Sequence, residues 1–477
     1  MITGLIILLY FFLFAVAIYN IVAEYQMKKN INAYICLQTA FILYYILIPF
    51  LANIFLLVHQ GPLNGYLLRI SNAQNSEIVY AFIYTVVAYI TILITHHLLK
   101  PSKEPEIKPE GTNLLDNETN FSSELMDELN NQVFRFSVLA GMATLFIGVA
   151  SELVIANSLG GIFQAIALGD KLRAFGMDSS EYIPQSKLFL MVLMVISLAS
   201  TYFFVYAIRI KKQFILFILL GISVLASIFY LLINAGRLGI LLFLLTFFID
   251  FTMRKTKHPF ILMGAFTLVV LVLLGSLDDL FFQLSYGTAR KGSEGNTVIS
   301  ILTEFAFPYV NLLNVHKMNI EYGLRWGLDF VTWIVNIIPT RILGIFGFTK
   351  ITAGYTFVTK YYSGANAMGG TPTDLLTFGI RQFGTLGVLV NSALVTGFCK
   401  YFDEVVEKIA SKNFTFITLR ISSIMFIIVP YADLDSFVRN RYDMILVLIF
   451  AIIVSKIRTI PIEAQSLALK KTKNLGK

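Results

Sequence analysis

The sequence predicts an all-α, polytopic membrane protein with about eleven transmembrane helices and one large loop on the outer side. Of its 477 residues, 57% are hydrophobic and only 14% are charged, and the mean hydropathy is +0.74. Soluble domains carry roughly 25% charged residues, because polar groups must cover their surface. The apolar residues come in blocks of about 20, the length that a helix needs to cross a bilayer. We therefore treat residues 1–477 as a single transmembrane domain.

Short polar or basic connections separate the apolar blocks. The predicted spans lie at 2–22, 33–58, 77–98, 134–157, 187–208, 213–233, 237–252, 259–276, 373–398, 414–430 and 442–456. The first block begins almost at Met1, with no basic stretch before it and no small-residue cleavage site after it. We interpret it as a retained helix rather than a cleaved signal peptide.

Basic clusters fall on alternate connections. They are Lys28-Lys29, Lys100 to Lys108, Arg209 to Lys212, Arg254 to Lys257, Lys400 to Lys412 and the tail from Lys456 to Lys477. The positive-inside rule places all of them in the cytoplasm. The net charge of +8 therefore indicates orientation in a membrane and not binding to nucleic acid.

Two connections are long. Residues 99–133 are polar, contain three prolines and are predicted to form a cytoplasmic linker. Residues 277–372 form the large outer loop, in which the semi-apolar stretch 330–345 predicts an amphipathic helix on the membrane surface. A loop of this length in a compact membrane protein is usually functional.

Motifs for nucleotides and metals are absent from the sequence. There is no Walker A spacing, no GxGxxG after a strand, no HExxH and no Cys/His set with metal-ligand spacing. Asp278-Asp279 abuts a membrane end, and Asp433 and Asp435 lie in a short connection. We therefore expect no metal site and no cofactor.

With nucleotide and metal motifs absent, the arginines on the predicted outer side are the remaining candidates for binding a substrate. Outer or boundary arginines are Arg173, Arg237, Arg290, Arg325, Arg341, Arg439 and Arg441. The planar guanidinium donates paired hydrogen bonds to phosphate and stays charged. A single arginine can equally pair with a nearby acid or reach toward lipid headgroups. Arg237 is the sharpest case, because only Asn234-Ala235-Gly236 separates it from an apolar block.

A second candidate anion-binding feature is the turn Gly369-Gly370-Thr371-Pro372-Thr373-Asp374, which leads directly into an apolar block. The amides at the start of that helix favour an anion. Thr-Pro is also a common start signal for a helix and needs no ligand.

The order of these features resembles the oligosaccharide repeat-unit polymerases, the O-antigen polymerases of the Wzy type. The matching motifs are Gly160-Gly161 followed by Leu172-Arg173, then Gly236-Arg237, then Ile338-Pro339 with Arg341, and finally Thr371-Pro372 with Phe378-Gly379. The resemblance covers residues 134–400, and it rests on the order and placement of motifs that are each short.

The resemblance implies a GT-C-like, metal-independent glycosyltransferase in the bacterial cytoplasmic (inner) membrane, with its active site facing the periplasm. Such enzymes polymerise undecaprenyl-diphosphate-linked oligosaccharides into O-antigen, capsular polysaccharide or exopolysaccharide. The growing glycan is transferred to the non-reducing end of a single lipid-linked repeat unit. The implied partners are these lipid-linked oligosaccharides, membrane lipid and a chain-length regulator protein.

This chemistry needs cations on the leaving diphosphate and a base for the attacking hydroxyl. The diphosphate candidates are Arg173, Arg237, Arg290 and Arg341. The base candidates are His316, Glu304 and Asp374. His316 is the only histidine of the large loop, and histidine ordinarily titrates near neutral pH, although a plain surface histidine fits the pattern equally well.

Two alternatives stay open. An O-antigen ligase uses the same donor with a lipid A–core acceptor and has a similar topology. A lipid-linked oligosaccharide flippase belongs to a different class, and transporters of that kind are expected to show internal repeats, which we do not find.

Overall fold

The computed structural model describes most of the predicted spans and part of the outer loop. The described residues are 2–28, 32–59, 61, 63, 65–99, 115–169, 183–184, 187–234, 305–336, 338, 340–364, 371–409, 428–435, 442–454 and 456–457, with isolated positions at 239–240, 243–244, 247–248, 252, 262, 269, 283 and 302. Within these residues the chain is helical and contains no strand. The predicted all-α polytopic class is therefore confirmed.

The helices follow the chain in a simple order. They are α1 (Ile2–Lys28), α2 (Ala33–Phe41), a π-helical turn (Ile42–Leu47), α3 (Ile48–Val58), α4 (Gly65–Ser71), α5 (Asn75–Leu98), α6 (Leu115–Ser158), α7 (Ile162–Ala167), α9 (Leu188–Met194), α10 (Ile196–Ile210), α11 (Phe214–Ile233), α15 (Phe307–Tyr322), a 3-10 turn (Leu328–Phe330), α16 (Thr332–Asn336), α17 (Thr340–Ile345), α18 (Gly354–Ser363), α19 (Leu375–Phe383) and α20 (Leu386–Ile409).

Six helices of the described residues are long and apolar enough to cross a membrane. They are Gly4–Met27, Ala33–Val58, Asn75–Leu98, Asp127–Ser158, Phe189–Ile210 and Phe214–Ile233, and Tyr442–Val454 is a shorter apolar helix. These helices coincide, within several residues at each end, with the predicted spans 2–22, 33–58, 77–98, 134–157, 187–208, 213–233 and 442–456. Most of the residues in the predicted spans 237–252, 259–276 and 414–430 lie outside the described residues, so the total of eleven stays a prediction.

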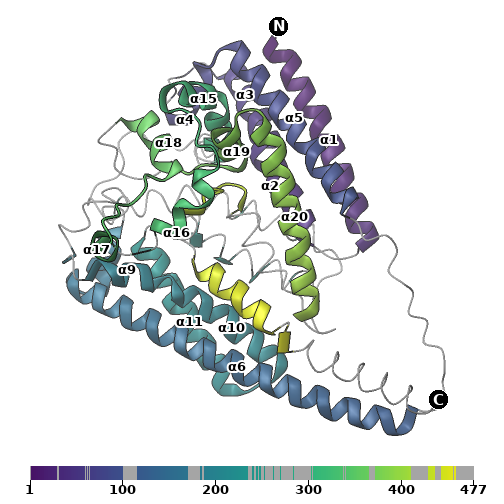
Figure 1. The fold of residues 1–477 in the computed structure, drawn as a ribbon, viewed down its shortest axis with the longest axis vertical. Helices are drawn as coiled ribbons and strands as arrows, with labels where there is room; N and C mark the ends of the chain where they lie inside the picture. Colours follow the sequence, from purple (N-terminus) through teal and green to yellow (C-terminus); the bar gives the residue numbers. More distant parts are fainter. Residues whose placement is uncertain are drawn as a thin grey trace.

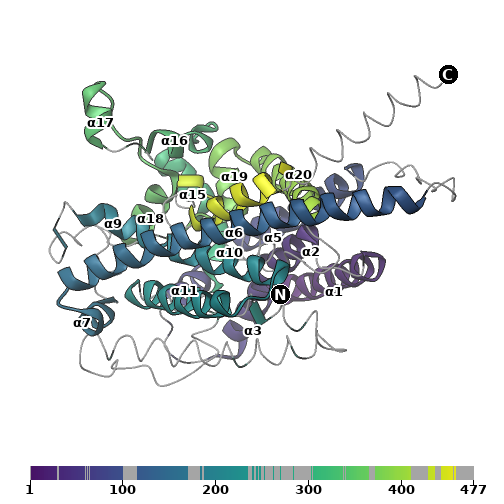
Figure 2. The same cartoon turned by 90° about the horizontal axis from the view of Figure 1, so that it is seen from below.

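The helices form two groups that pack side by side (Figures 1 and 2). In one group, α1, α2, α5, α15, α19 and α20 surround the largest hydrophobic core. In the other, α6 lies against α9, α10 and α11. Hydroxyl groups link these helices inside the second group, where Thr201 Oγ1 lies 3.0 Å from both Ser223 Oγ and Ser227 Oγ. Small polar residues of this kind commonly hold membrane helices together.

The predicted linker differs from the structure at its C-terminal part. Helix α6 begins at Leu115 and continues without a break to Ser158. Residues 112–140 contain neither glycine nor proline, so nothing in the sequence interrupts a helix there. At 1.5 Å per residue this helix is roughly 66 Å long, about twice the hydrocarbon thickness of a bilayer. The cytoplasmic location of 99–133 stays a prediction.

The predicted single span 373–398 is wrong. Two antiparallel helices, α19 and α20, occupy this stretch and are joined at Gly384, whose φ of 63° suits the reversal of the chain. The helices touch at Gly379 and Gly387, where an added Cβ would collide with the opposite backbone. Asn391 Nδ2 donates to Leu375 O at 2.7 Å and fixes the register of this hairpin.

The region expected as one large outer loop contributes to the core. Helix α15 is almost completely buried from Phe307 to Val315, and Asn53 Nδ2 donates to the Tyr309 hydroxyl at 3.0 Å. The expected amphipathic helix at 330–345 is divided into the 3-10 turn Leu328–Phe330, α16 and α17. Ile338-Pro339 explains the last division, because a proline disfavours helical backbone in the residue before it.

Candidate functional site

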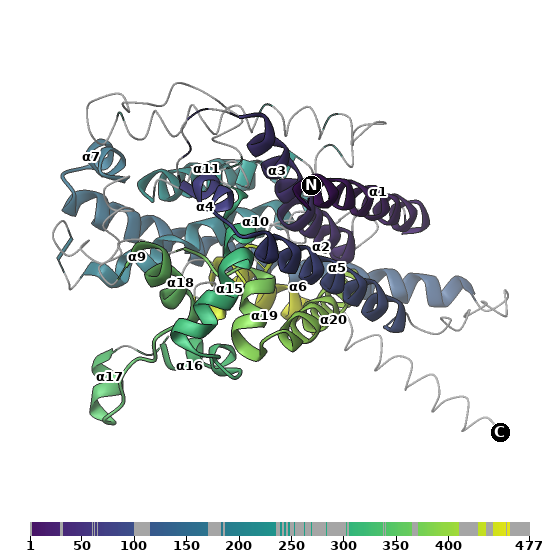
Figure 3. The same cartoon turned by 90° about the horizontal axis from the view of Figure 1, so that it is seen from above.

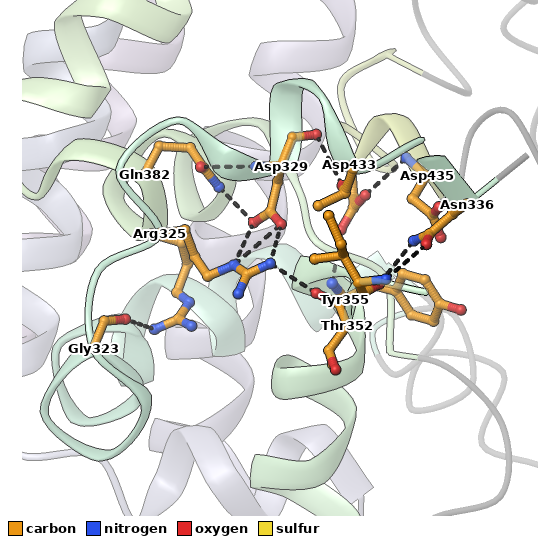
Figure 4. Close-up of polar contacts among 12 residues, drawn as sticks. Gly323, Arg325, Asp329, Asn336, Thr352, Tyr355, Gln382, Asp433 and Asp435 are labelled. Atoms are coloured by element: carbon orange, nitrogen blue, oxygen red, sulfur yellow. Dashed lines mark hydrogen bonds and ion pairs between the residues drawn. The ribbon is translucent and has the colours of Figure 1, made fainter. Parts of the chain in front are cut away.

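The described part of the chain contains a buried polar cluster, which we call the arginine–aspartate cluster: Arg325, Asp329, Arg381, Gln382 and Asp433. Its members come from the turn after α15, the last turn of α19 and the segment 431–435 (Figure 4). Two backbone hydrogen bonds join the first two elements, from Arg325 N to Arg381 O at 2.8 Å and from Trp326 N to Gln382 O at 2.9 Å. Segments far apart in the sequence are therefore held together by main-chain contacts.

Arg325 and Asp329 form the central ion pair. Arg325 Nη2 lies 2.7 Å from Asp329 Oδ1, and the side chains are only 11% and 1% exposed. Arg325 Nε donates to the same carboxylate at 3.1 and 3.2 Å. Gln382 Nε2 donates to Asp329 Oδ2 at 2.7 Å. The charge of Arg325 is thus neutralised inside the protein.

Arg381 carries a buried charge with neutral acceptors. The residue is 2% exposed. Its Nη1 donates to Met318 O at 3.1 Å, Asn319 Oδ1 at 2.7 Å and Gly323 O at 3.0 Å. Its Nε and Nη2 are buried and have no hydrogen-bond partner among the residues that the structure describes. A buried guanidinium with unused donors is well suited to accept an anion.

One aromatic ring lies against both guanidinium groups. The centroid of the Phe357 ring is 4.9 Å from Arg325 Cζ and 6.0 Å from Arg381 Cζ. These distances are within the range of cation–π attraction, which stabilises a positive charge that water no longer reaches.

Asp433 supplies a carboxyl group that titrates near neutral pH. It is fully buried and accepts hydrogen bonds from Tyr355 N at 2.7 Å and Asp435 N at 2.9 Å. Burial, together with the nearby charge of Asp329, raises the pKa of Asp433 to about 7. A carboxyl group with such a pKa can take up or release a proton at neutral pH, as general acid–base catalysis requires.

Gly354 separates the two carboxylates. A Cβ added to this residue would lie 2.5 Å from Asp329 Oδ2 and 3.0 Å from Asp433 Oδ2. The first residue of α18 therefore lies close to both acids, and only glycine fits without a shift of one of them.

His316 is exposed on α15 outside this cluster. Its Nε2 lies 2.6 Å from the hydroxyl of Tyr84 on α5, and the ring of Tyr80 contacts it edge-on. It stays a candidate base, and the contact with the Tyr84 hydroxyl holds the Nε2 edge of the ring in place.

Asp374 is buried, and both of its carboxylate oxygens accept hydrogen bonds from neighbouring donors. Tyr45 donates to Oδ1 at 2.6 Å, Asn311 Nδ2 donates to Oδ2 at 3.1 Å, and Thr377 N donates to Oδ1 at 3.2 Å. The helix start predicted after Thr371-Pro372 is present as α19, and the anion at its N-terminus is the chain's own Asp374. This geometry gives Asp374 the role of a helix cap.

The other predicted site residues are not brought into this cluster by the described structure. Glu304, Arg173, Arg237 and Arg290 lie outside the described residues. Arg341 belongs to α17, which projects away from the body of the protein (Figure 3).

The sequence analysis missed Arg381, Gln382 and Asp329. Arg381 carried a usable signal, because it stands inside a block that we predicted to span the membrane, and a charge there is usually functional or paired. Among the described residues, no group of three or more His, Cys, Asp or Glu side chains could hold a metal ion.

Comparison with protein-family models, with curated proteins and with solved structures finds no match for this chain.

Proposed function

We propose that this chain is a membrane glycosyltransferase that polymerises undecaprenyl-diphosphate-linked oligosaccharide repeat units on the outer face of the bacterial cytoplasmic membrane. The observation that carries the proposal is the buried Arg381, whose Nε and Nη2 have no partner among the described residues. These two donors suit one oxygen pair of a diphosphate. The all-helical, multi-spanning fold is consistent with a lipid-linked substrate.

In the proposed reaction, a sugar hydroxyl of the single repeat unit attacks the anomeric carbon of the growing glycan. The new glycosidic C–O bond forms while the bond between the anomeric carbon and the diphosphate oxygen breaks. Arg381 stabilises the charge that develops on the leaving diphosphate. Asp433 takes the proton of the attacking hydroxyl, since its carboxyl group titrates near pH 7. His316 is the second candidate for this proton transfer, and Arg325 positions Asp329 beside Asp433.

A deletion strain complemented with variants tests this function. Arg381→Ala should leave single repeat units on the surface lipid, because removal of one preorganised donor typically costs on the order of 10²–10³ in rate. Arg381→Lys should give short chains, because lysine keeps the charge and loses the planar fork. The matched control is Arg135→Ala, since Arg135 is exposed on α6 and lies outside the cluster. Membrane levels of each variant are measured by immunoblot.

The pattern of glycans separates this function from its alternatives. Loss of a polymerase leaves one repeat unit on the final acceptor. Loss of a ligase leaves long polymer on the lipid carrier, and loss of a flippase leaves repeat units on the cytoplasmic leaflet. Full-length polymer from Arg381→Ala at normal protein level would exclude Arg381 from the site.

A further inference from the structure

The segment Trp326–Phe348 exposes an unusual number of large apolar side chains. Trp326 is 75% exposed, Phe346 is 69% exposed, and Val331 and Ile334 are half-exposed. Ile345, the last residue of α17, and Phe348, three residues beyond it, are exposed as well. We call this stretch the apolar segment. Contiguous exposed apolar surface marks a region that another molecule or a membrane covers.

The apolar segment has two different faces. Asp329, Thr332 and Asn336 are buried and point toward the protein, where Asp329 belongs to the arginine–aspartate cluster. Leu328, Val331 and Ile334, which alternate with them, are exposed. The outward face is therefore separated from the cluster by the thickness of one short helix, about 10 Å.

The segment lies at the N-terminal end of α20. It is tied to the end of α19 by the hydrogen bond from Trp326 N to Gln382 O, and α20 starts four residues later. Asp403, near the opposite end of α20, accepts both 2.9 Å hydrogen bonds from Ala33 N at the start of α2. The eighteen residues of helix from Leu386 to Asp403 rise roughly 26 Å, close to the hydrocarbon thickness of a bilayer. The segment and Asp403 are therefore separated by about the hydrocarbon thickness of a bilayer.

The exposed surface continues from the segment onto α20, which packs against the spanning helix α5. The rings of Phe330 and Phe383 stack at 6.3 Å, so the segment rests on the α19–α20 turn. Leu386, Leu389 and Leu394 then continue the exposed apolar surface along α20. Helices α16, α17 and α20 lie on the same side of the body in both side views (Figures 2 and 3). Lipid that covers α20 therefore also meets the apolar segment.

We propose that the apolar segment inserts into the outer leaflet at the boundary of headgroups and acyl chains, and that its occupant is membrane lipid. The two tryptophans of the chain, Trp326 and Trp333, both lie in this segment, and tryptophan favours the membrane–water boundary. The arginine–aspartate cluster then lies beside the headgroup layer rather than in bulk water. This inference concerns the membrane contact and holds independently of the proposed reaction.

Because the chain has only these two tryptophans, their fluorescence reports on this segment alone. The full-length protein is placed in nanodiscs of phosphatidylcholine brominated near the headgroup end of the acyl chain, near its middle, or not at all. Trp333→Phe isolates Trp326, and Trp326→Phe isolates Trp333. We expect the emission of Trp326 to be quenched most by bromine near the headgroup and only weakly by aqueous iodide.

Acidic substitutions on the exposed face of the apolar segment should weaken its contact with lipid. In the Trp333→Phe background, Val331→Asp with Ile334→Asp should lower the quenching by bromine, since two carboxylates draw the segment toward water. Strong quenching of Trp326 by iodide with none by brominated lipid would overturn the proposal in favour of a water-exposed surface. Protection from both quenchers would overturn it in favour of a protein partner. Neither readout depends on polymer synthesis.

Discussion

Arg325 donates two hydrogen bonds to one carboxylate oxygen of Asp329: its Nη2 and Nε lie 2.7 and 3.1 Å from Asp329 Oδ1. Both side chains are almost inaccessible to water. Removal of one partner therefore leaves a buried charge without its counter-ion, while removal of both leaves no unpaired charge and loses packing and neutral hydrogen bonds, such as the one from Gln382 Nε2.

We predict that Asp329→Ala lowers the free energy of unfolding by roughly 3–5 kcal/mol. The double variant Arg325→Ala with Asp329→Ala should lose less than the sum of the two single losses, because the pair acts as a unit. Denaturant unfolding in detergent micelles measures all three. Additive losses within about 0.5 kcal/mol would show that the pair is not coupled.

Gly354 offers a steric test of the same region. Gly354→Ala places a methyl group 2.5 Å from Asp329 Oδ2, so one carboxylate must move. We expect a loss of stability of roughly 1–3 kcal/mol and a loss of polymer length. Gly344→Ala in α17 is the matched control, because a Cβ there has no neighbour within 4 Å. The result is contradicted by a Gly354→Ala protein as stable and active as the control.

The raised pKa of Asp433, about 7, predicts how activity depends on pH. A general base works in its deprotonated form, so the polymerisation rate should rise with pH through about 7 and then level off. Rates are measured on proteoliposomes that carry the lipid-linked repeat unit. His316→Gln should keep the same midpoint. If His316→Gln removes the pH dependence, His316 is the base and Asp433 is not.

Two variants of the helix-cap residue Asp374 distinguish a role in folding from a role in catalysis. Asp374→Asn keeps an oxygen that can accept from Thr377 N, so the protein should fold and polymerise. Asp374→Ala leaves the Tyr45 hydroxyl and Asn311 amide without this acceptor and should lower stability by about 1–3 kcal/mol. Thermal unfolding and glycan length are followed together. Loss of polymer in a stable Asp374→Asn protein would make Asp374 catalytic after all.

The sequence predicted the long apolar helices well, because a run of about 20 apolar residues has few other uses. It did not predict α15, whose asparagines, His316 and Lys317 read as a surface loop. The structure shows why this helix is stable, since its buried face contacts the spanning helix Ala33–Val58 through Asn53 and the start of α19 through Asp374. Contacts between distant segments of this kind leave no periodic signal in one sequence.

The candidate site was less predictable than the fold. The sequence directed attention to arginine, but to Arg341 and not to the buried Arg381. Arg381 lies in a helix that turns back at Gly384, so its position depends on a reversal inside an apolar block. Asp433 becomes informative only when Gly354 and Asp329 lie beside it.

The backbones of α19 and α20 touch at Gly379 and Gly387, so we expect this helical hairpin to move as one rigid unit, like a strut. With no room for a methyl group on either side, the helices can neither slide nor tilt past one another. The strut joins Asp374, tied to Tyr45 deep among the spanning helices, to Arg381 roughly 10 Å further along. A displacement of the π-helical turn that holds Tyr45 is therefore expected to shift the guanidinium of Arg381 as well.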